Sequence, residues 1–274
     1  MSRSRSSDVD SMLLSVHGLQ IAVRIRGEGD PLLLINGMSR PLESWEPFSR
    51  QLTGRTVVSF DAPGVGASAT PVLPVSIAGL AELAVAVLDA AGFDDADVLG
   101  FSHGGAVAQQ LACDAPNRLR RLVLVATSCG IGATPGSRGV LLRDLEMPDD
   151  GNAWRRPDAW SLLSQSLAFA SWSSIPFLGA ITARTLVVCG AHDRLVPPAN
   201  SRLLARRIPN ASFVMLAGGH NLQRPEPARL LARAVEDFLG PVAVVSGKHA
   251  AERWSHAAVG QDALPTEDMI GQRP

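Results

Sequence analysis

Short runs of apolar residues recur along the chain in two patterns. Residues 19–27 alternate around Ile21, Val23 and Ile25, which is the period-two pattern of a strand in an antiparallel sheet. Later runs are short and mainly apolar, which is typical of strands that helices cover on both faces of a parallel sheet. These runs are Leu32–Ile35, Val57–Phe60, Val98–Phe101, Leu122–Val125, Leu186–Cys189 and Phe213–Leu216.

Helical stretches separate these predicted strands. The clearest ones are residues 76–91 and 103–115, where apolar residues recur at helical spacing. Strands that alternate with helices predict an α/β fold, with a mostly parallel, doubly wound sheet.

Three regions interrupt this alternation. Residues 1–10 and 241–274 lack a periodic pattern, and we expect both to be largely disordered. Residues 131–180 join two core strands by a connection too long for an ordinary loop, which predicts a helical cap or lid. The remaining residues, 11–130 and 181–240, would then form the core domain.

The predicted cap is rich in aromatic residues. We expect them to give an apolar lining that contacts the acyl part of a substrate, although aromatic clusters more often pack against one another. The candidates are Trp154, Trp160, Phe169, Trp172 and Phe177.

Composition narrows the class of protein. A formal net charge of -1 gives no reason to expect a nucleic-acid partner. The three cysteines, Cys113, Cys129 and Cys189, match no metal-binding spacing and suggest a reducing compartment. With neither a secretory signal nor a run of about 20 apolar residues, we expect a soluble cytoplasmic protein. The sequence leaves the oligomeric state open.

The strongest chemical signal is the sequence Gly100-Phe101-Ser102-His103-Gly104. It matches G-x-S-x-G between a predicted strand and a predicted helix, the context in which such a serine is a nucleophile. A tight turn there would place the hydroxyl at a helix N-terminus, where the helix dipole favours developing negative charge. An ordinary glycine-rich turn is the alternative.

A serine nucleophile needs an adjacent base, and the base needs a group to orient it. His220 follows the last core strand, and Asp193 follows the strand before it. This gives the chain order Ser, Asp, His that accompanies the motif. A surface histidine and a solvated turn aspartate are the alternatives.

The negative charge that develops during ester cleavage needs two N–H donors. We expect one from His103, after the nucleophile, and one from Met38, in the loop after Leu32–Ile35. The glycine pair Gly64 and Gly66 weakly suggests a phosphate loop, but a structural turn is the better interpretation, because no third glycine or lysine follows. We predict neither a metal nor a cofactor.

These motifs, in this order, resemble the α/β-hydrolase superfamily over roughly residues 15–240. Segments such as LLLINGMSRPLESWEPF, SFDAPGVGASATP and GFSHGGAVAQQLA are most similar to intracellular poly(3-hydroxyalkanoate) depolymerases. The resemblance implies a triad of Ser102, Asp193 and His220 that hydrolyses a storage polyester or its oligomers.

Two alternatives remain open. The same fold serves small-ester carboxylesterases and C–C bond hydrolases, and the fold alone does not separate them. A ligand receptor of slow turnover built on this fold is the other alternative, and repeated turnover of a p-nitrophenyl ester would exclude it.

Overall fold

A mixed β-sheet forms the centre of the part of the chain that the structure describes. The computed structural model describes residues 11–137 and 159–240. Its eight strands lie in the order β1-β2-β4-β3-β5-β6-β7-β8. β2 pairs antiparallel with β1 and β4, and the remaining neighbours are parallel. The strands are β1 Met12–Val16, β2 Leu19–Arg26, β3 Asp30–Ile35, β4 Arg55–Phe60, β5 Ala96–Phe101, β6 Leu119–Val125, β7 Arg184–Gly190 and β8 Ala211–Leu216.

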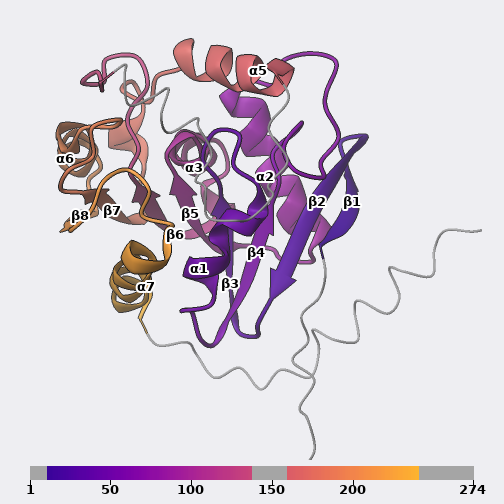
Figure 1. Ribbon diagram of the computed structural model, residues 1–274, viewed down its shortest axis with the longest axis horizontal. Helices are drawn as coiled ribbons and strands as arrows, with labels where there is room; N and C mark the ends of the chain where they lie inside the picture. Colours follow the sequence, from indigo (N-terminus) through magenta and orange to yellow (C-terminus); the bar gives the residue numbers. More distant parts are fainter. Residues whose placement is uncertain (1–10, 138–158, 241–274) are drawn as a thin grey trace, which may run out of the picture. The chain divides into compact units, whose positions relative to one another are not determined.

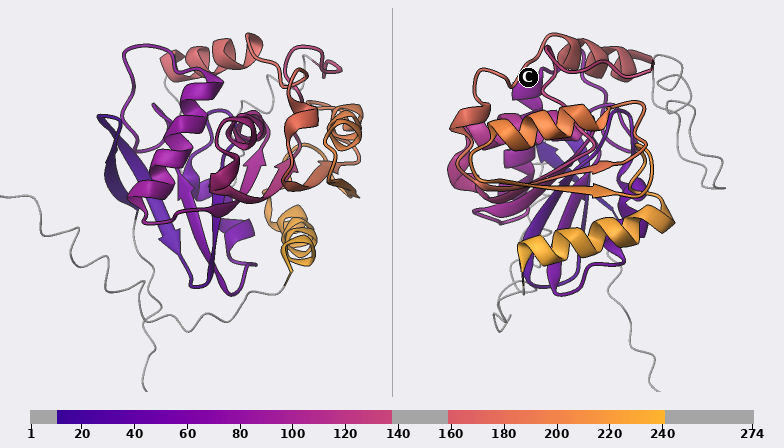
Figure 2. Two further views of the ribbon diagram at one scale, coloured as in Figure 1. Left: turned by 180° about the vertical axis from the view of Figure 1, so that it is seen from behind. Right: turned by 90° about the vertical axis from the view of Figure 1, so that its left-hand side faces the viewer.

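Helices cover both faces of this sheet (Figures 1 and 2). One face carries α2, α3 and α6, and the other carries α1 and α7. Helix α5 lies above the edge where the parallel strands end (Figure 1). The α-helices are α1 Glu46–Ser49, α2 Ile77–Ala90, α3 His103–Asp114, α5 Ala159–Ala170, α6 Pro198–Arg207 and α7 Pro225–Leu239. Short 3-10 helices are η1 Leu42–Trp45, η2 Pro116–Arg118 and η3 Leu178–Ala180.

The central strands alternate their side chains between two apolar clusters. In β3, Leu33 and Ile35 join the cluster under α2 and α3, whereas Leu32 and Leu34 join the cluster under α7. Since successive residues of a strand point to opposite faces, a continuous apolar run supplies both clusters at once. This explains why the central strands lack the alternation seen in residues 19–27.

The fold class is the predicted one, and each predicted strand and helix named above is present. Two details differ from the prediction. β1 is a further strand that pairs with β2. In β8, Phe213 and Met215 are more than one-third exposed, because an edge strand lacks a neighbour and full helix cover on one side. The predicted disordered ends lie outside the described residues, as does part of the predicted cap.

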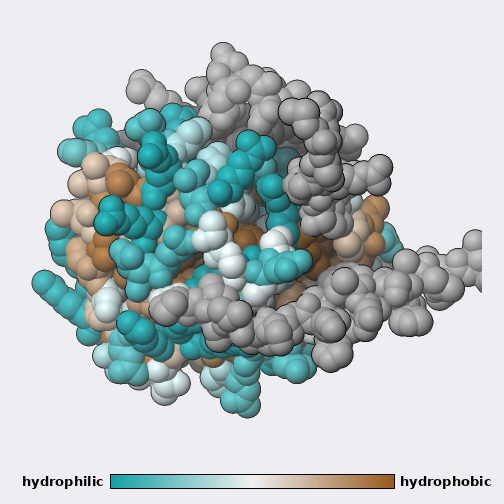
Figure 3. Space-filling view, turned by 90° about the horizontal axis from the view of Figure 1, so that it is seen from below, coloured by the Kyte–Doolittle hydropathy of each residue, from teal (hydrophilic) through white to brown (hydrophobic). Residues whose placement is uncertain are grey.

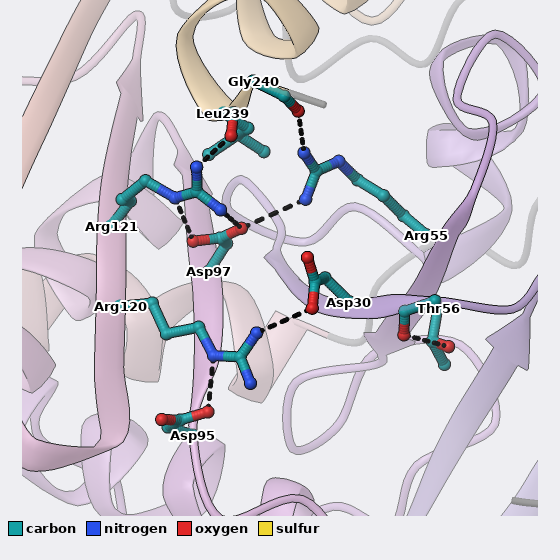
Figure 4. A network of polar contacts seen from close by, with 10 residues as sticks. Asp30, Arg55, Thr56, Asp95, Asp97, Arg120, Arg121, Leu239 and Gly240 are labelled. Carbon is teal, nitrogen blue, oxygen red and sulfur yellow. Dashed lines mark hydrogen bonds and ion pairs between the residues drawn. The ribbon is translucent and has the colours of Figure 1, made fainter. Parts of the chain in front are cut away.

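Charged residues gather at the opposite edge of the sheet, where the parallel strands begin (Figure 4). Asp97 accepts a bidentate pair from Arg121 and a further bond from Arg55. The same two guanidinium groups donate to the carbonyls of Leu239 and Gly240. Cations at the C-terminal end of a helix are favourable, so this cluster fixes the end of α7 to the sheet.

The surface near this charged edge is also polar. Seen from below, hydrophilic side chains predominate among the coloured residues (Figure 3). Within the described ranges, no helix combines the length and the apolar character needed to cross a bilayer. The three cysteines carry no disulfide.

Candidate active site

Ser102 lies at the turn between β5 and α3. Its backbone has φ 53° and ψ −117°, a region that non-glycine residues rarely adopt. Neighbouring groups hold the turn: the Ser102 N–H donates to the Val125 carbonyl at 2.8 Å, and the Ser102 carbonyl accepts from Gly105 N–H and Thr127 Oγ1. Strained backbone that the surroundings fix in this way is common at functional sites.

The two glycines on either side of Ser102 contact neighbouring backbone so closely that no side chain fits at either position. A Cβ on Gly100 would lie 2.4 Å from the Gly104 carbonyl oxygen. A Cβ on Gly104 would lie 2.2 Å from the Ile35 carbonyl oxygen. The G-x-S-x-G spacing is therefore a packing requirement of this turn, which brings α3 against the ends of β3 and β5.

Ser102, His220 and Asp193 form one hydrogen-bonded chain. His220 Nε2 lies 3.0 Å from Ser102 Oγ, and His220 Nδ1 lies 2.9 Å from Asp193 Oδ2. All three side chains follow strands of the parallel sheet, so the fold brings them to one edge. Asp193 and His220 are both more than nine-tenths buried, so little water competes for these bonds.

Asp193 has a separate partner for each carboxylate oxygen. Oδ2 faces His220, while Oδ1 accepts from the N–H groups of Leu195 and Val196 at 3.0 and 2.8 Å. The two backbone bonds fix the carboxylate plane. Its second oxygen can then hold the imidazole with Nδ1 protonated and Nε2 free to accept the serine proton.

A network around Asn36 shapes the loop that follows β3. Its amide nitrogen donates to the carbonyls of Arg40 and Pro41 and to Ser44 Oγ. Its oxygen accepts from Gly37 N–H and from Gln223 Nε2. Asn36 therefore links the loop containing Met38 to the segment containing His220.

The structure brings the two predicted oxyanion donors to this edge of the sheet. Met38 lies in the loop after β3, and His103 is the first residue of α3. The first N–H groups of a helix have no acceptor within it, so the His103 N–H suits a negatively charged ligand. The role of both N–H groups stays a prediction.

The His103 side chain extends toward the cap. Its ring centroid lies 6.0 Å from that of Phe169, and its Nε2 is buried without a hydrogen-bond partner within residues 11–137 and 159–240. Burial lowers the pKa of His103 to about 4, although a hydrogen bond with the Gln165 backbone acts in the opposite direction. The imidazole is therefore neutral at pH 7.

The loop with Gly64 and Gly66 closes around a carboxylate. Asp61 is buried and accepts from the N–H groups of Leu42 and Ala67 at 2.7 and 3.0 Å. Burial raises the pKa of Asp61 to about 6, against the lowering effect of these two hydrogen bonds. Because a carboxylate occupies this loop, the structural interpretation of the glycine pair is favoured over a phosphate site.

The predicted aromatic residues of the cap do not form one group. Phe169, Trp172 and Phe177 lie in a row with centroid distances of 6.3 and 6.2 Å and pack against the core. Trp160 lies apart, with its indole N–H donating to the Pro71 carbonyl. Trp154 lies outside the described residues. Contact of these residues with a substrate stays a prediction.

Sequence reasoning missed the contribution of Gln165. This residue of α5 reaches the loop after β3, where its Oε1 accepts from the Ser39 N–H at 2.9 Å. Sequence spacing gives no signal for a bond between residues 126 positions apart. A glutamine in an amphipathic helix is normally interpreted as facing solvent.

Comparisons with known proteins agree with the fold described above. A family model described as the alpha/beta hydrolase fold matches residues 30–157 and 141–227. A poly(3-hydroxyalkanoate) depolymerase from Ectopseudomonas oleovorans is 37% identical over 219 residues, which cover 69% of this chain and 77% of that protein. A 2-hydroxymuconate semialdehyde hydrolase from Pseudomonas putida is 30% identical over 256 residues, which cover 81% and 91%. The crystal structure of a hydrolase from Pseudomonas aeruginosa PA01 has a TM-score of 0.74 at 28% identity, over 85% of this chain and 99% of that one.

Proposed function

Because this chain belongs to the alpha/beta hydrolase fold family, we propose that it is a serine hydrolase that cleaves carboxylic esters through an acyl-enzyme. The observation that carries the proposal is the hydrogen-bonded chain from Ser102 through His220 to Asp193. A serine hydroxyl is a weak nucleophile until a positioned base removes its proton. The three residues supply the nucleophile, the base and the group that orients the base.

In the first half of the reaction, Ser102 Oγ attacks the ester carbonyl while His220 Nε2 takes the hydroxyl proton. The carbonyl π electrons move to oxygen, and the N–H groups of Met38 and His103 receive that negative charge. When the intermediate collapses, the C–O bond of the ester breaks and His220 returns the proton to the leaving alcohol. The acyl group stays on Ser102.

In the second half, water takes the place of the serine hydroxyl as the nucleophile. His220 removes a proton from water, the resulting hydroxide attacks the acyl carbon, and the proton passes to Ser102 Oγ as the acid leaves. Asp193 keeps its charge throughout and stabilises the imidazolium that forms twice in each cycle.

For the substrate, we propose a 3-hydroxyalkanoate polyester or its oligomers. The similarity to the depolymerase from Ectopseudomonas oleovorans supports this class. The aromatic residues of the cap would contact the acyl chain, and each additional buried methylene contributes about 0.8 kcal/mol. Hydrolysis rates should therefore rise from acetyl esters to esters of medium chain length.

A C–C bond hydrolase is the second candidate, because the similarity to the 2-hydroxymuconate semialdehyde hydrolase covers 81% of this chain. The two candidates share the triad but differ in the bond that breaks. Turnover of p-nitrophenyl esters and of a 3-hydroxyalkanoate oligomer, compared with turnover of 2-hydroxymuconate semialdehyde, separates them.

The test of the nucleophile is covalent. A fluorophosphonate probe should label the wild-type protein with one equivalent and should not label Ser102→Ala. A Ser128→Ala variant, which removes another hydroxyl near the end of β6, is the matched control and should label normally. Labelling of Ser102→Ala to the same extent as wild type would contradict the assignment of Ser102.

A further inference from the structure

Helix α5 differs from an ordinary surface helix in the side chains that it buries completely. A helix on a protein surface normally buries its apolar stripe. Here the fully buried side chains are small or polar, three large apolar ones are exposed, and Leu162 and Phe169 are partly buried. The buried residues are Ser161, Ser164, Gln165 and Ala168, and the exposed ones include Trp160, Leu163 and Leu167. The inward polar face therefore needs an explanation other than burial of apolar surface.

The contact of Gln165 with Ser39 gives that explanation. Ser39 has φ 57°, in the left-handed region that disfavours a residue with a Cβ. Gln165 Oε1 accepts the Ser39 N–H at 2.9 Å, and both residues are about 95% buried. The bond holds Ser39 in an unfavourable conformation, directly after Met38.

The orientation of the Gln165 amide is fixed by this bond. Gln165 Nε2 and Ser39 Oγ are both buried without a hydrogen-bond partner among the described residues. A flipped amide would set Nε2 against the Ser39 N–H, so that two donors would face each other. The Gln165 amide therefore directs its oxygen at the Ser39 N–H, even though its nitrogen then has no hydrogen-bond partner among the described residues.

Two more contacts join α5 to the same catalytic elements. Ser166 Oγ lies 3.5 Å from Met38 Sδ. The Phe169 ring lies beside the His103 ring, with centroids 6.0 Å apart and the ring planes tilted by 48°. Within one and a half turns, α5 therefore contacts both residues whose N–H groups are the proposed oxyanion donors.

We propose that Gln165 is a positioning residue, which acts through Ser39 to aim the Met38 N–H at the oxyanion. This inference rests on the proposed function. It makes the seating of α5 on the core a condition for full stabilisation of the tetrahedral intermediate, and not merely for substrate access. A positioned donor contributes mainly to the transition state, so its loss should lower kcat and leave KM nearly unchanged.

The test compares two substitutions of similar length. Gln165→Met keeps the length of the side chain and loses the acceptor, whereas Gln165→Glu keeps an acceptor oxygen. With p-nitrophenyl butyrate, kcat should fall about 10- to 100-fold in Gln165→Met, somewhat less than after complete loss of an oxyanion donor. Gln165→Glu should recover most of this loss. Ser164→Ala removes a buried hydroxyl one residue away and should keep the wild-type kcat.

A tetrahedral inhibitor distinguishes positioning from packing. A trifluoromethyl ketone forms an oxyanion adduct with the serine, so its Ki should rise in Gln165→Met by the same factor as kcat falls. A general packing defect would lower Tm, but Ki would not rise by the factor by which kcat falls. If Gln165→Met does not fold, Gln165→Asn, which stays polar but is too short to reach Ser39, takes its place.

The outcomes separate the two proposals. Wild-type kcat and Ki in Gln165→Met would overturn this inference alone. Equal losses in Gln165→Met and Gln165→Glu would also overturn it, because the acceptor would then be irrelevant. A wild-type protein that neither turns over esters nor reacts with fluorophosphonate would overturn the proposed function itself.

Discussion

The side chain of Asp193 shows how closely one residue is constrained at this site. Each carboxylate oxygen has its own donors, so an amide at this position cannot satisfy both sets. In Asp193→Asn, the amide oxygen would face the N–H groups of Leu195 and Val196 and the NH2 would face His220. That arrangement favours the wrong imidazole tautomer, with the proton on Nε2.

We therefore expect Asp193→Asn to lower kcat by about 10⁴, in analogy with other triads. The Tm should change by a few degrees at most, because the amide keeps the backbone bonds. Ester hydrolysis and thermal melting measure the two effects. Asp95→Asn, the same change at the far edge of the sheet, should leave kcat unaltered, and an unchanged kcat in Asp193→Asn would contradict the role of Asp193.

His103 makes the stability of the fold depend on pH. Between its ordinary pKa of 6.5 and its folded value of about 4, the unfolded chain binds a proton that the folded protein excludes. The free energy of unfolding should therefore fall as the pH is lowered through this range. The His103 contribution amounts to at most about 3 kcal/mol.

Asp61 has the opposite effect. Its pKa is raised in the folded protein, so the folded state binds the extra proton between pH 3.8 and about 6, and its contribution grows as the pH falls. Urea unfolding from pH 4 to 7 separates the two residues. His103→Phe should become more stable relative to wild type toward pH 4, and Asp61→Asn should become less stable. If the difference in free energy of unfolding between His103→Phe and wild type did not change with pH, His103 would not be a buried, neutral imidazole in the folded protein.

At the scale of elements, Asp97 joins three strands and one helix. It lies in β5, and its partners Arg55 and Arg121 lie in β4 and β6 and also hold the carbonyls that end α7. The side chains of Asp97 and Arg55 are 0% and 1% exposed. Removing one partner of a buried ion pair leaves a charge without compensation.

Asp97→Asn should therefore lower the free energy of unfolding by about 3–5 kcal/mol and the Tm by roughly 10 °C. Asp95→Asn is the matched control, because its pair with Arg120 is about 40% exposed and such pairs contribute at most about 1 kcal/mol. Chemical and thermal unfolding measure both variants. Equal effects of the two substitutions would show that the buried cluster does not stabilise the end of α7.

The elements also show where sequence reasoning succeeds and where it does not. A continuous apolar run such as Leu32–Ile35 predicts a central strand, because both of its faces are buried. The positions of Ser102, Asp193 and His220 follow from the rule that parallel strands end at one edge. The orientation of α5 does not follow, because its outward Leu163 and Leu167 give the pattern of an inward face. Packing against the loop after β3 determines it.

At the scale of the whole molecule, the edge where the parallel strands end differs in character from the edge where they begin. In the part of the chain that the structure describes, the edge with Ser102 carries strained backbone and buried polar groups without hydrogen-bond partners, and the edge with Asp97 carries paired charges. Strain at a functional site requires support from elsewhere in the fold. For Ser102 that support comes from the bonds with Val125 and Thr127 at the end of β6, while the charged edge separately fixes the end of α7 to the sheet.

A chain shortened to residues 11–244 should keep both its Tm and its esterase rate. It retains every strand and helix of the described core and the Gly240 carbonyl that accepts from Arg55. Thermal melting and p-nitrophenyl ester hydrolysis, compared with the full chain, test this expectation. A chain ending at residue 238 would lose both carbonyl acceptors and should melt at a lower temperature; equal melting of the two shortened chains would contradict this account of α7.

The guanidinium of Arg55 holds the Gly240 carbonyl at the charged edge of the sheet. The described core ends at Gly240, on the edge of the sheet opposite Ser102 and α5. A resin or carrier protein joined directly after Gly240 would lie beside the charged edge and leave the nucleophile facing away from the support. Coupling through an engineered cysteine on the exposed face of α5, at Leu163, would press the helix that supports the oxyanion loop against the support. Immobilised preparations made in these two ways should therefore differ in turnover per bound molecule, with the C-terminally attached one the more active.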